Sequence, residues 1–214
     1  MKSNKVLMII ASLVLTFGFL FAVYKLTNTA PRDFKDITVI QSGDHVKWSP
    51  DRKYILVEFS DLQCPACKVF HDITTSFEAT GSANASIPKK VTFVFRHFPL
   101  FQVHENAFEM AYAVEAASRQ GKFFQLVNAV FADQATLETT KDVKAFVLDK
   151  AKSVGLNIAQ LTQDMDSKQV KDKVNADLAQ GERAGINGTP TFFLDGTKLE
   201  FQTPVEFVEI LKKL

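Results

Sequence analysis

Residues 54–67 read YILVEFSDLQCPAC, and the prediction of the fold starts from this stretch. Residues 54–57 are apolar and free of Gly and Pro, which is typical of a β-strand covered on both faces. After Cys67 the spacing changes to that of one helix face, formed by Val69, Ile73 and Phe77 with Phe70 beside them. Pro65 suits the first helical turn, where its missing N–H costs nothing. We therefore predict a buried strand that delivers two cysteines to a helix N-terminus.

This placement predicts a redox site. Unpaired N–H groups and the helix dipole favour a thiolate at Cys64. In CxxC motifs the pKa of this cysteine falls to about 3.5–7.5, and the thiolate is the species that attacks disulfides. Cys67 is one turn further along, close enough to form a disulfide with Cys64 and to resolve a mixed disulfide. A purely structural disulfide is disfavoured, because so short a loop constrains little of the unfolded chain.

Glu58 is the unusual residue of the strand. A carboxylate among apolar neighbours is costly unless it has a partner or a task. Because it precedes Cys64 by six residues, it could lie under the helix and shuttle the proton of Cys67. The alternative is that Glu58 ends the buried stretch and reaches water. The candidate catalytic residues are thus Cys64, Cys67 and Glu58.

Four segments together carry a family resemblance: Glu58-Phe59, the Cys64–Cys67 motif, Arg96-His97-Phe98-Pro99-Leu100 and Gly188-Thr189-Pro190-Thr191. In this order they resemble the DsbA branch of the thioredoxin superfamily, over residues 44–214. The resemblance implies an α/β thioredoxin fold with an inserted helical subdomain. It also implies an enzyme that oxidises exported proteins.

The resemblance further implies how substrate binds. Thr189-Pro190 would form a cis peptide bond facing Cys64, turning the Thr189 backbone toward a substrate strand and keeping metals from the thiols. The alternative from the sequence is a trans proline that begins an edge strand. Pro65 and Ala66 would also contact substrate. The best-known members carry Pro-His between the cysteines, so this difference leaves the oxidising strength open.

Five regions follow from these segments and from the composition along the chain. They are a signal-anchor or transmembrane segment at 1–26, a tether at 27–43, the first part of the thioredoxin fold at 44–100, the inserted helical subdomain at 101–184, and the part with the cis-proline loop at 185–214.

The N-terminal segment predicts export. Residues 6–24 are uncharged and long enough to span a bilayer. Lys2 and Lys5 precede them, which favours a cytoplasmic N-terminus. We predict an uncleaved single-pass anchor in the inner membrane, with the catalytic domain on the periplasmic side. The alternative is a signal peptide cleaved after Ala30, which would release the protein to the periplasm.

Composition excludes several other classes. The 25 Lys and Arg nearly balance the 24 Asp and Glu, and no basic run marks a nucleic-acid surface. Both cysteines lie in the CxxC, which leaves no stray thiol for an exchange site to trap. The four histidines are scattered, and no second CxxC or HxxxH completes a zinc site. Neither a metal nor a cofactor is expected.

These features predict an exported, membrane-tethered thiol:disulfide oxidoreductase that introduces disulfide bonds through Cys64 and Cys67. Its partners would be exported proteins with free thiols, and it would act as a monomer. Re-oxidation by a quinone-linked membrane oxidase is implied by the resemblance alone. The alternatives are a reductase or isomerase of the same fold, or a peptide-binding or chaperone module with an incidental dithiol.

Overall fold

The computed structural model describes residues 2–27, 34–51 and 53–214, and it contains two compact units, Met1–Asp33 and Phe34–Leu214. The first unit holds one helix, α1 (Lys2–Thr27). The sequence predicts a membrane span at residues 1–26; across the residues that the structure describes, however, no helix is both long and apolar enough to cross a membrane.

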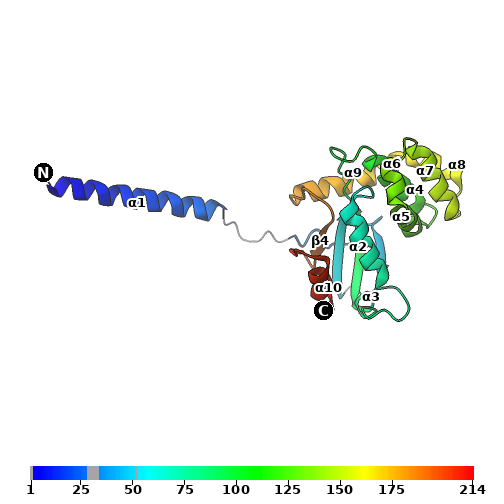
Figure 1. Cartoon of the computed structure of the whole chain (residues 1–214), viewed down its shortest axis with the longest axis horizontal. Helices are drawn as coiled ribbons and strands as arrows, with labels where there is room; N and C mark the ends of the chain where they lie inside the picture. Colours follow the sequence, from blue (N-terminus) through cyan, green and yellow to red (C-terminus); the bar gives the residue numbers. More distant parts are fainter. Residues whose placement is uncertain (1, 28–33, 52) are drawn as a thin grey trace. The chain divides into compact units, whose positions relative to one another are not determined.

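The second unit is built on a five-stranded sheet with the strand order β1-β3-β2-β4-β5 (Figure 1). Its strands are β1 (His45–Trp48), β2 (Tyr54–Ser60), β3 (Val91–His97), β4 (Thr191–Leu194) and β5 (Thr197–Lys198). β2 and β3 run parallel, and the other neighbours pair antiparallel. The predicted α/β class is therefore confirmed, with the strand before the CxxC at the centre of the sheet.

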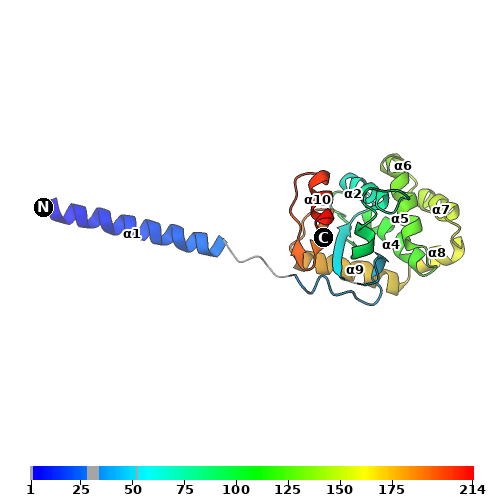
Figure 2. The same ribbon diagram turned by 90° about the horizontal axis from the view of Figure 1, so that it is seen from below.

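Both faces of the sheet are covered, which explains the unbroken apolar run of β2. Side chains alternate between two hydrophobic clusters: Leu56 joins the larger one, while Val57 and Phe59 join the smaller one. The helices α2 (Pro65–Ser76) and α10 (Pro204–Lys212) lie on one side of the sheet, and α9 (Lys168–Arg183) lies on the other (Figure 2). The central strand β2 therefore lies between two layers of helices, and the loop with the CxxC follows directly from its end.

The buried face of α2 starts at the second cysteine. Cys67, Phe70 and Thr74 are buried within the helix, and Phe77 continues the same stripe just after it. Val69 was expected on this face, but it is 47% exposed. The spacing 67, 70, 74, 77 explains the difference, because it is the helical repeat that starts from Cys67. The sulfur of the second cysteine is therefore a core atom.

The predicted helical insertion lies between β3 and β4 and begins at Ala107. It consists of α4 (Ala107–Ser118), α5 (Phe123–Ala132), α6 (Gln134–Thr139), α7 (Val143–Ser153), α8 (Ile158–Met165) and α9, whereas the short helix α3 (Ile87–Lys90) precedes β3. In α9 a Cβ at Gly181 would lie 2.5 Å from the ring of Phe98, so glycine permits this close approach.

The predicted tether at 27–43 is only partly a tether. Residues 28–33 lie outside the described part of the chain. From Phe34 onward the segment packs on the domain, with Ile37 only 1% exposed. The buried Arg96 guanidinium donates hydrogen bonds to the carbonyl oxygens of Ile37 (2.6 Å) and Val39 (2.9 Å). Residues 34–43 thus belong to the folded unit, because an apolar side chain and a charged donor from β3 hold them there.

Candidate active site

The two cysteines occupy the N-terminus of α2 as predicted. Cys64 is the N-cap residue and Pro65 is the first helical residue. Both cysteines are free thiols. Cys64 is 7% exposed, whereas Cys67 is fully buried and its sulfur accepts a hydrogen bond from the Asp61 backbone N–H at 3.4 Å. An incoming disulfide or thiolate can therefore reach Cys64 and not Cys67.

The electrostatics make the pair asymmetric. A hydrogen bond from the Cys67 thiol and the backbone N–H groups of Cys67 and Ala66 lower the pKa of Cys64 to about 5, against the opposing effect of burial. Burial raises the pKa of Cys67 well above its ordinary value, and the neighbouring Cys64 sulfur adds to this effect. At neutral pH the accessible sulfur is thus a thiolate while the buried sulfur keeps its proton.

Glu58 lies within β2, between Phe95 of β3 and Phe192 of β4 in the pairing register. It is buried, so the alternative in which it reaches water is wrong. Burial raises the pKa of Glu58 to about 7, and the charge on Cys64 acts in the same direction. Its own charge in turn raises the pKa of Cys67. Glu58 is therefore a buried carboxyl with a raised pKa whose charge acts on Cys67.

The loop before β4 contacts Cys64 across the fold. The Thr189–Pro190 peptide bond is cis, and the Cys64 thiol donates a hydrogen bond to the Thr189 carbonyl oxygen at 3.3 Å. A carbonyl oxygen only accepts hydrogen bonds, so this contact belongs to the protonated form of Cys64. Pro65 and Ala66 are exposed beside Cys64. The four residues expected to bind substrate therefore flank the accessible sulfur or lie beside it.

The sequence match to a known family covers most of this unit. The family model described as thioredoxin matches residues 41–213, which include the CxxC, Glu58 and the cis-proline loop. The chain belongs to the thioredoxin family. Its helices between β3 and β4 form the helical insertion that the sequence predicts for this fold.

Solved structures share the same architecture. A thioredoxin-like oxidoreductase from Silicibacter pomeroyi is 24% identical, with a TM-score of 0.66 over 86% of this chain and 96% of the other. Alpha-DsbA1 of Wolbachia pipientis is 21% identical, with a TM-score of 0.68 over 85% and 95% of the two chains. BdbD from Bacillus subtilis is 24% identical, with a TM-score of 0.66 over 80% and 92%. At these identities the likeness shows the fold: a thioredoxin fold with a helical insertion.

Curated relatives with higher sequence identity are named Na(+)/H(+) antiporters. A protein of Mycobacterium sp. (strain KMS) called Na(+)/H(+) antiporter NhaA 1 is 32% identical over 195 residues, which are 86% of this chain and 30% of that protein. A protein of Herminiimonas arsenicoxydans called Na(+)/H(+) antiporter NhaA is 32% identical over 159 residues, 73% of this chain and 23% of that protein. This thioredoxin-family chain spans under a third of each.

Asp61 organises the loop around the cysteines in a way that the sequence analysis missed. Its carboxylate is fully buried and accepts hydrogen bonds from Gln63 N (2.8 Å), Leu100 N (2.7 Å) and His104 Nδ1 (2.9 Å). Its backbone N–H is the donor to Cys67 described above. An aspartate whose side chain bonds the backbone two residues later is a recognisable turn signal, so the sequence did contain a clue to the first contact.

Gln134, at the start of α6, is a second residue that the sequence did not reveal. It is 3% exposed, and its side-chain amide donates hydrogen bonds to the carbonyl oxygens of Leu62 (2.9 Å) and Cys64 (3.1 Å). The helical insertion thus holds the backbone of Leu62 and Cys64. No local pattern marks Gln134, because its partners are about seventy residues away in the chain.

Replacing Gln134 by leucine is expected to lower the free energy of unfolding by about 1–3 kcal/mol, since the buried Leu62 carbonyl would lose its donor and the Cys64 carbonyl would keep only the bond from Lys68 N. The pKa of Cys64 should shift as well, because the loop is no longer fixed. Urea unfolding and thiolate absorbance measure the two effects. Gln169→Leu, at an exposed glutamine bonded to Arg119, is the matched control and should change stability by under about 0.5 kcal/mol. Equal effects of both variants would contradict the assignment.

Proposed function

We propose that this chain is an exported thiol:disulfide oxidoreductase that introduces disulfide bonds into proteins with free thiols. One arrangement carries the proposal: Cys64 is the N-cap of α2 with its pKa lowered to about 5, while Cys67 beside it is buried and its pKa is raised. A stabilised thiolate favours the reduced form of the enzyme, and this preference makes its disulfide an oxidant.

The proposed reaction exchanges one disulfide bond between the Cys64–Cys67 pair and two thiols of the substrate. A substrate thiolate attacks the Cys64 sulfur of the Cys64–Cys67 disulfide, and Cys67 leaves and takes up a proton. A second substrate thiolate then attacks the substrate sulfur of the mixed disulfide, and Cys64 leaves as a thiolate. Its low pKa makes it a good leaving group. Two electrons pass from the substrate to the enzyme, and one new disulfide remains in the substrate.

Glu58, Thr189, Pro190, Pro65 and Ala66 have supporting roles in this proposal. Glu58 supplies the proton that Cys67 takes up. The other four form the surface against which the substrate backbone lies around Cys64. Near them, a cavity of about 290 Å³ is lined by residues 98–103 and by residues from α9 and the loop that follows it, including Ile186 and Asn187. Its exposed apolar residues Phe101 and Val103 offer contacts to an extended peptide.

The compartment and the partners are part of the same proposal. Disulfides persist outside the cytoplasm, and residues 1–26 would take the domain there, as a membrane anchor or as a cleaved signal. The monomeric enzyme would be re-oxidised by a quinone-linked membrane protein. Cell fractionation with an antibody to the domain would distinguish an anchored chain from a released one.

The equilibrium of the Cys64–Cys67 pair with glutathione tests the function. A potential near about −120 mV is expected for a strong oxidant, whereas a value near about −270 mV would indicate a reductase. The second measurement is the oxidative refolding of a reduced protein with one native disulfide, with and without the enzyme. Suppressed aggregation without disulfide transfer would identify a chaperone and refute the proposal.

Glu58→Gln is expected to slow reduction of the enzyme disulfide by about 100-fold, because Cys67 then lacks its proton donor. The free energy of unfolding, in contrast, should increase at high pH. The pKa of Glu58 is raised to about 7, so the stability due to its protonated form is present below about pH 4 and lost as pH rises through 7. The variant should therefore be more stable than the wild type above pH 7.

Stopped-flow reduction and thermal melts from pH 4 to 9 measure the two effects of this substitution. Asp72→Asn, at an exposed carboxylate paired with Lys68, is the matched control and should behave as the wild type. A wild-type reduction rate in Glu58→Gln would remove Glu58 from the mechanism.

A further inference from the structure

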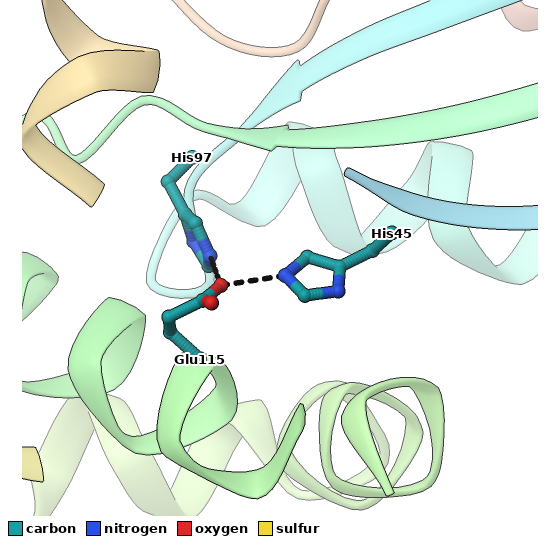
Figure 3. Close-up of side chains that lie close together, drawn as sticks. All are labelled: His45, His97 and Glu115. Atoms are coloured by element: carbon teal, nitrogen blue, oxygen red, sulfur yellow. Dashed lines mark hydrogen bonds and ion pairs between the residues drawn. The ribbon is translucent and has the colours of Figure 1, made fainter. Parts of the chain in front are cut away.

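Three side chains that are distant in the sequence meet beside the helical insertion. His45 begins β1, His97 ends β3, and Glu115 lies in α4 (Figure 3). The Nε2 atoms of His45 and His97 lie 2.5 Å and 3.1 Å from the same Glu115 oxygen, Oε2. One ligand atom from each of the three residues lies within 4.8 Å of the other two.

The cluster is shielded from solvent. The side chains of His45 and Glu115 are each 9% exposed, and that of His97 is 2% exposed. Both ion-pair partners of Glu115 in the described part of the chain are histidines. Three potential ligand side chains from separate elements thus converge in a shielded space, which is the arrangement that a bound cation requires.

The donor set fits zinc-class ions. Two imidazole nitrogens and one carboxylate oxygen are a known zinc ligand set, with a water molecule as the fourth ligand. Metal–ligand distances of about 2.0–2.2 Å place tetrahedral ligand atoms about 3.4 Å apart. The 2.5 Å and 3.1 Å separations are shorter than this, so outward side-chain shifts of under about 1 Å would open room for the ion.

The surrounding packing holds the ligands in place. The His45 ring stacks on Phe123 of α5, with centroids 3.5 Å apart and planes 12° apart. The edge of the His97 ring meets Phe123 and Phe95, with centroid distances of 5.7 Å and 5.5 Å. β1 and β3 are paired next to the cluster, where His45 faces Phe95. Ligands on two hydrogen-bonded strands and one helix form a rigid site, as metal binding requires.

We propose that His45, His97 and Glu115 bind one zinc-class divalent ion that fastens α4 to the edge of the sheet. The sequence predicts no metal site, because its four histidines are scattered and no second CxxC or HxxxH completes a zinc site. The site is separate from the thiol chemistry. It could exist whether or not the chain oxidises proteins.

Zinc titration of the tag-free, full-length, oxidised chain tests the proposal. The Cys64–Cys67 disulfide removes the thiolates that would otherwise bind zinc. Calorimetry should show one Zn²⁺ per chain, and Co²⁺ should give visible absorption bands of a four-coordinate site. At a hundredfold excess over Kd, the ion should raise Tm by about 5–10 °C. No binding at about 100 µM Zn²⁺ would overturn the proposal, leaving a hydrogen-bonded cluster only.

Substitutions locate the site. His45→Gln retains an amide donor for Glu115 but loses the imidazole, and it should weaken Zn²⁺ binding by at least about 100-fold. If this variant loses helical circular dichroism, His97→Gln is used in its place. His104→Gln is the matched control, because His104 also pairs with a buried carboxylate, that of Asp61. Unchanged binding in both His45→Gln and Glu115→Gln would place the ion elsewhere and refute the assignment.

Discussion

Cys64→Ala is expected to abolish disulfide transfer, lowering its rate by at least about a thousandfold to the uncatalysed level. Every disulfide that is broken in the proposed reaction includes the Cys64 sulfur, and the other sulfur cannot replace it. Cys67 is fully buried, and its raised pKa keeps it protonated and thus unreactive. The measurement is the rate at which a reduced two-cysteine substrate gains its disulfide.

Cys67→Ala is the matched variant for this experiment. It also loses turnover, because no internal disulfide can form, but it keeps the reactive sulfur. We expect it to accumulate a mixed disulfide when mixed with a disulfide-bonded peptide, because the Cys64 thiolate attacks one peptide sulfur and the other leaves as a thiolate; mass spectrometry detects the product. Cys64→Ala should form none. If Cys64→Ala keeps its activity, the dithiol is incidental and the chain acts as a peptide-binding module.

The second large effect is the pH dependence of Cys64 itself. With its pKa lowered to about 5, Cys64 should be about 99% thiolate at pH 7, whereas an ordinary cysteine is about 3% ionised. Alkylation by iodoacetamide should therefore be constant above about pH 6 and fall tenfold per pH unit below 5. Thiolate absorbance at each pH gives an independent titration curve. A midpoint near 8.5 would remove the physical basis of the proposed oxidant.

The same titration has a signature in stability. In the unfolded chain Cys64 binds a proton up to about pH 8.5, but in the folded reduced chain only up to about pH 5. The reduced protein should thus gain stability as pH rises from 5 to 8.5, and lose this contribution as pH falls through 5. The oxidised protein has no thiol to titrate here. Melts of both forms in the Glu58→Gln variant isolate the effect, because the pKa of Glu58 itself depends on the charge of Cys64.

The hydrogen bond from Cys67 provides the control for the titration. It is the largest cause of the lowered pKa, so Cys67→Ala should move the midpoint of Cys64 upward. Substitution of the exposed Val69 on the same helix should leave it unchanged. If the midpoint stays near 5 without Cys67, the helix N-terminus alone stabilises the thiolate.

The central strand, the helix that begins at the CxxC and the helical insertion could all be predicted from the sequence. These elements depend on local periodicity and on residues such as Pro65 that act within one turn, so a short window contains the information. The position of the two cysteines could be predicted for the same reason, because CxxC at a helix start is a local motif. The buried side of α2 was partly misjudged, since Val69 and Cys67 fit the helical period equally well until a core selects one.

Contacts between residues that are far apart in the sequence could be seen only in the tertiary structure. Gln134 reaches the carbonyl oxygen of Cys64 across 70 residues, and Glu115 joins His45 across the same separation. A hydrogen bond or a metal ligand needs its partner within a few ångströms in space, whatever the distance along the chain. The pairing of β1 with β3 and the packing of the insertion set those distances, and no spacing in the sequence encodes them.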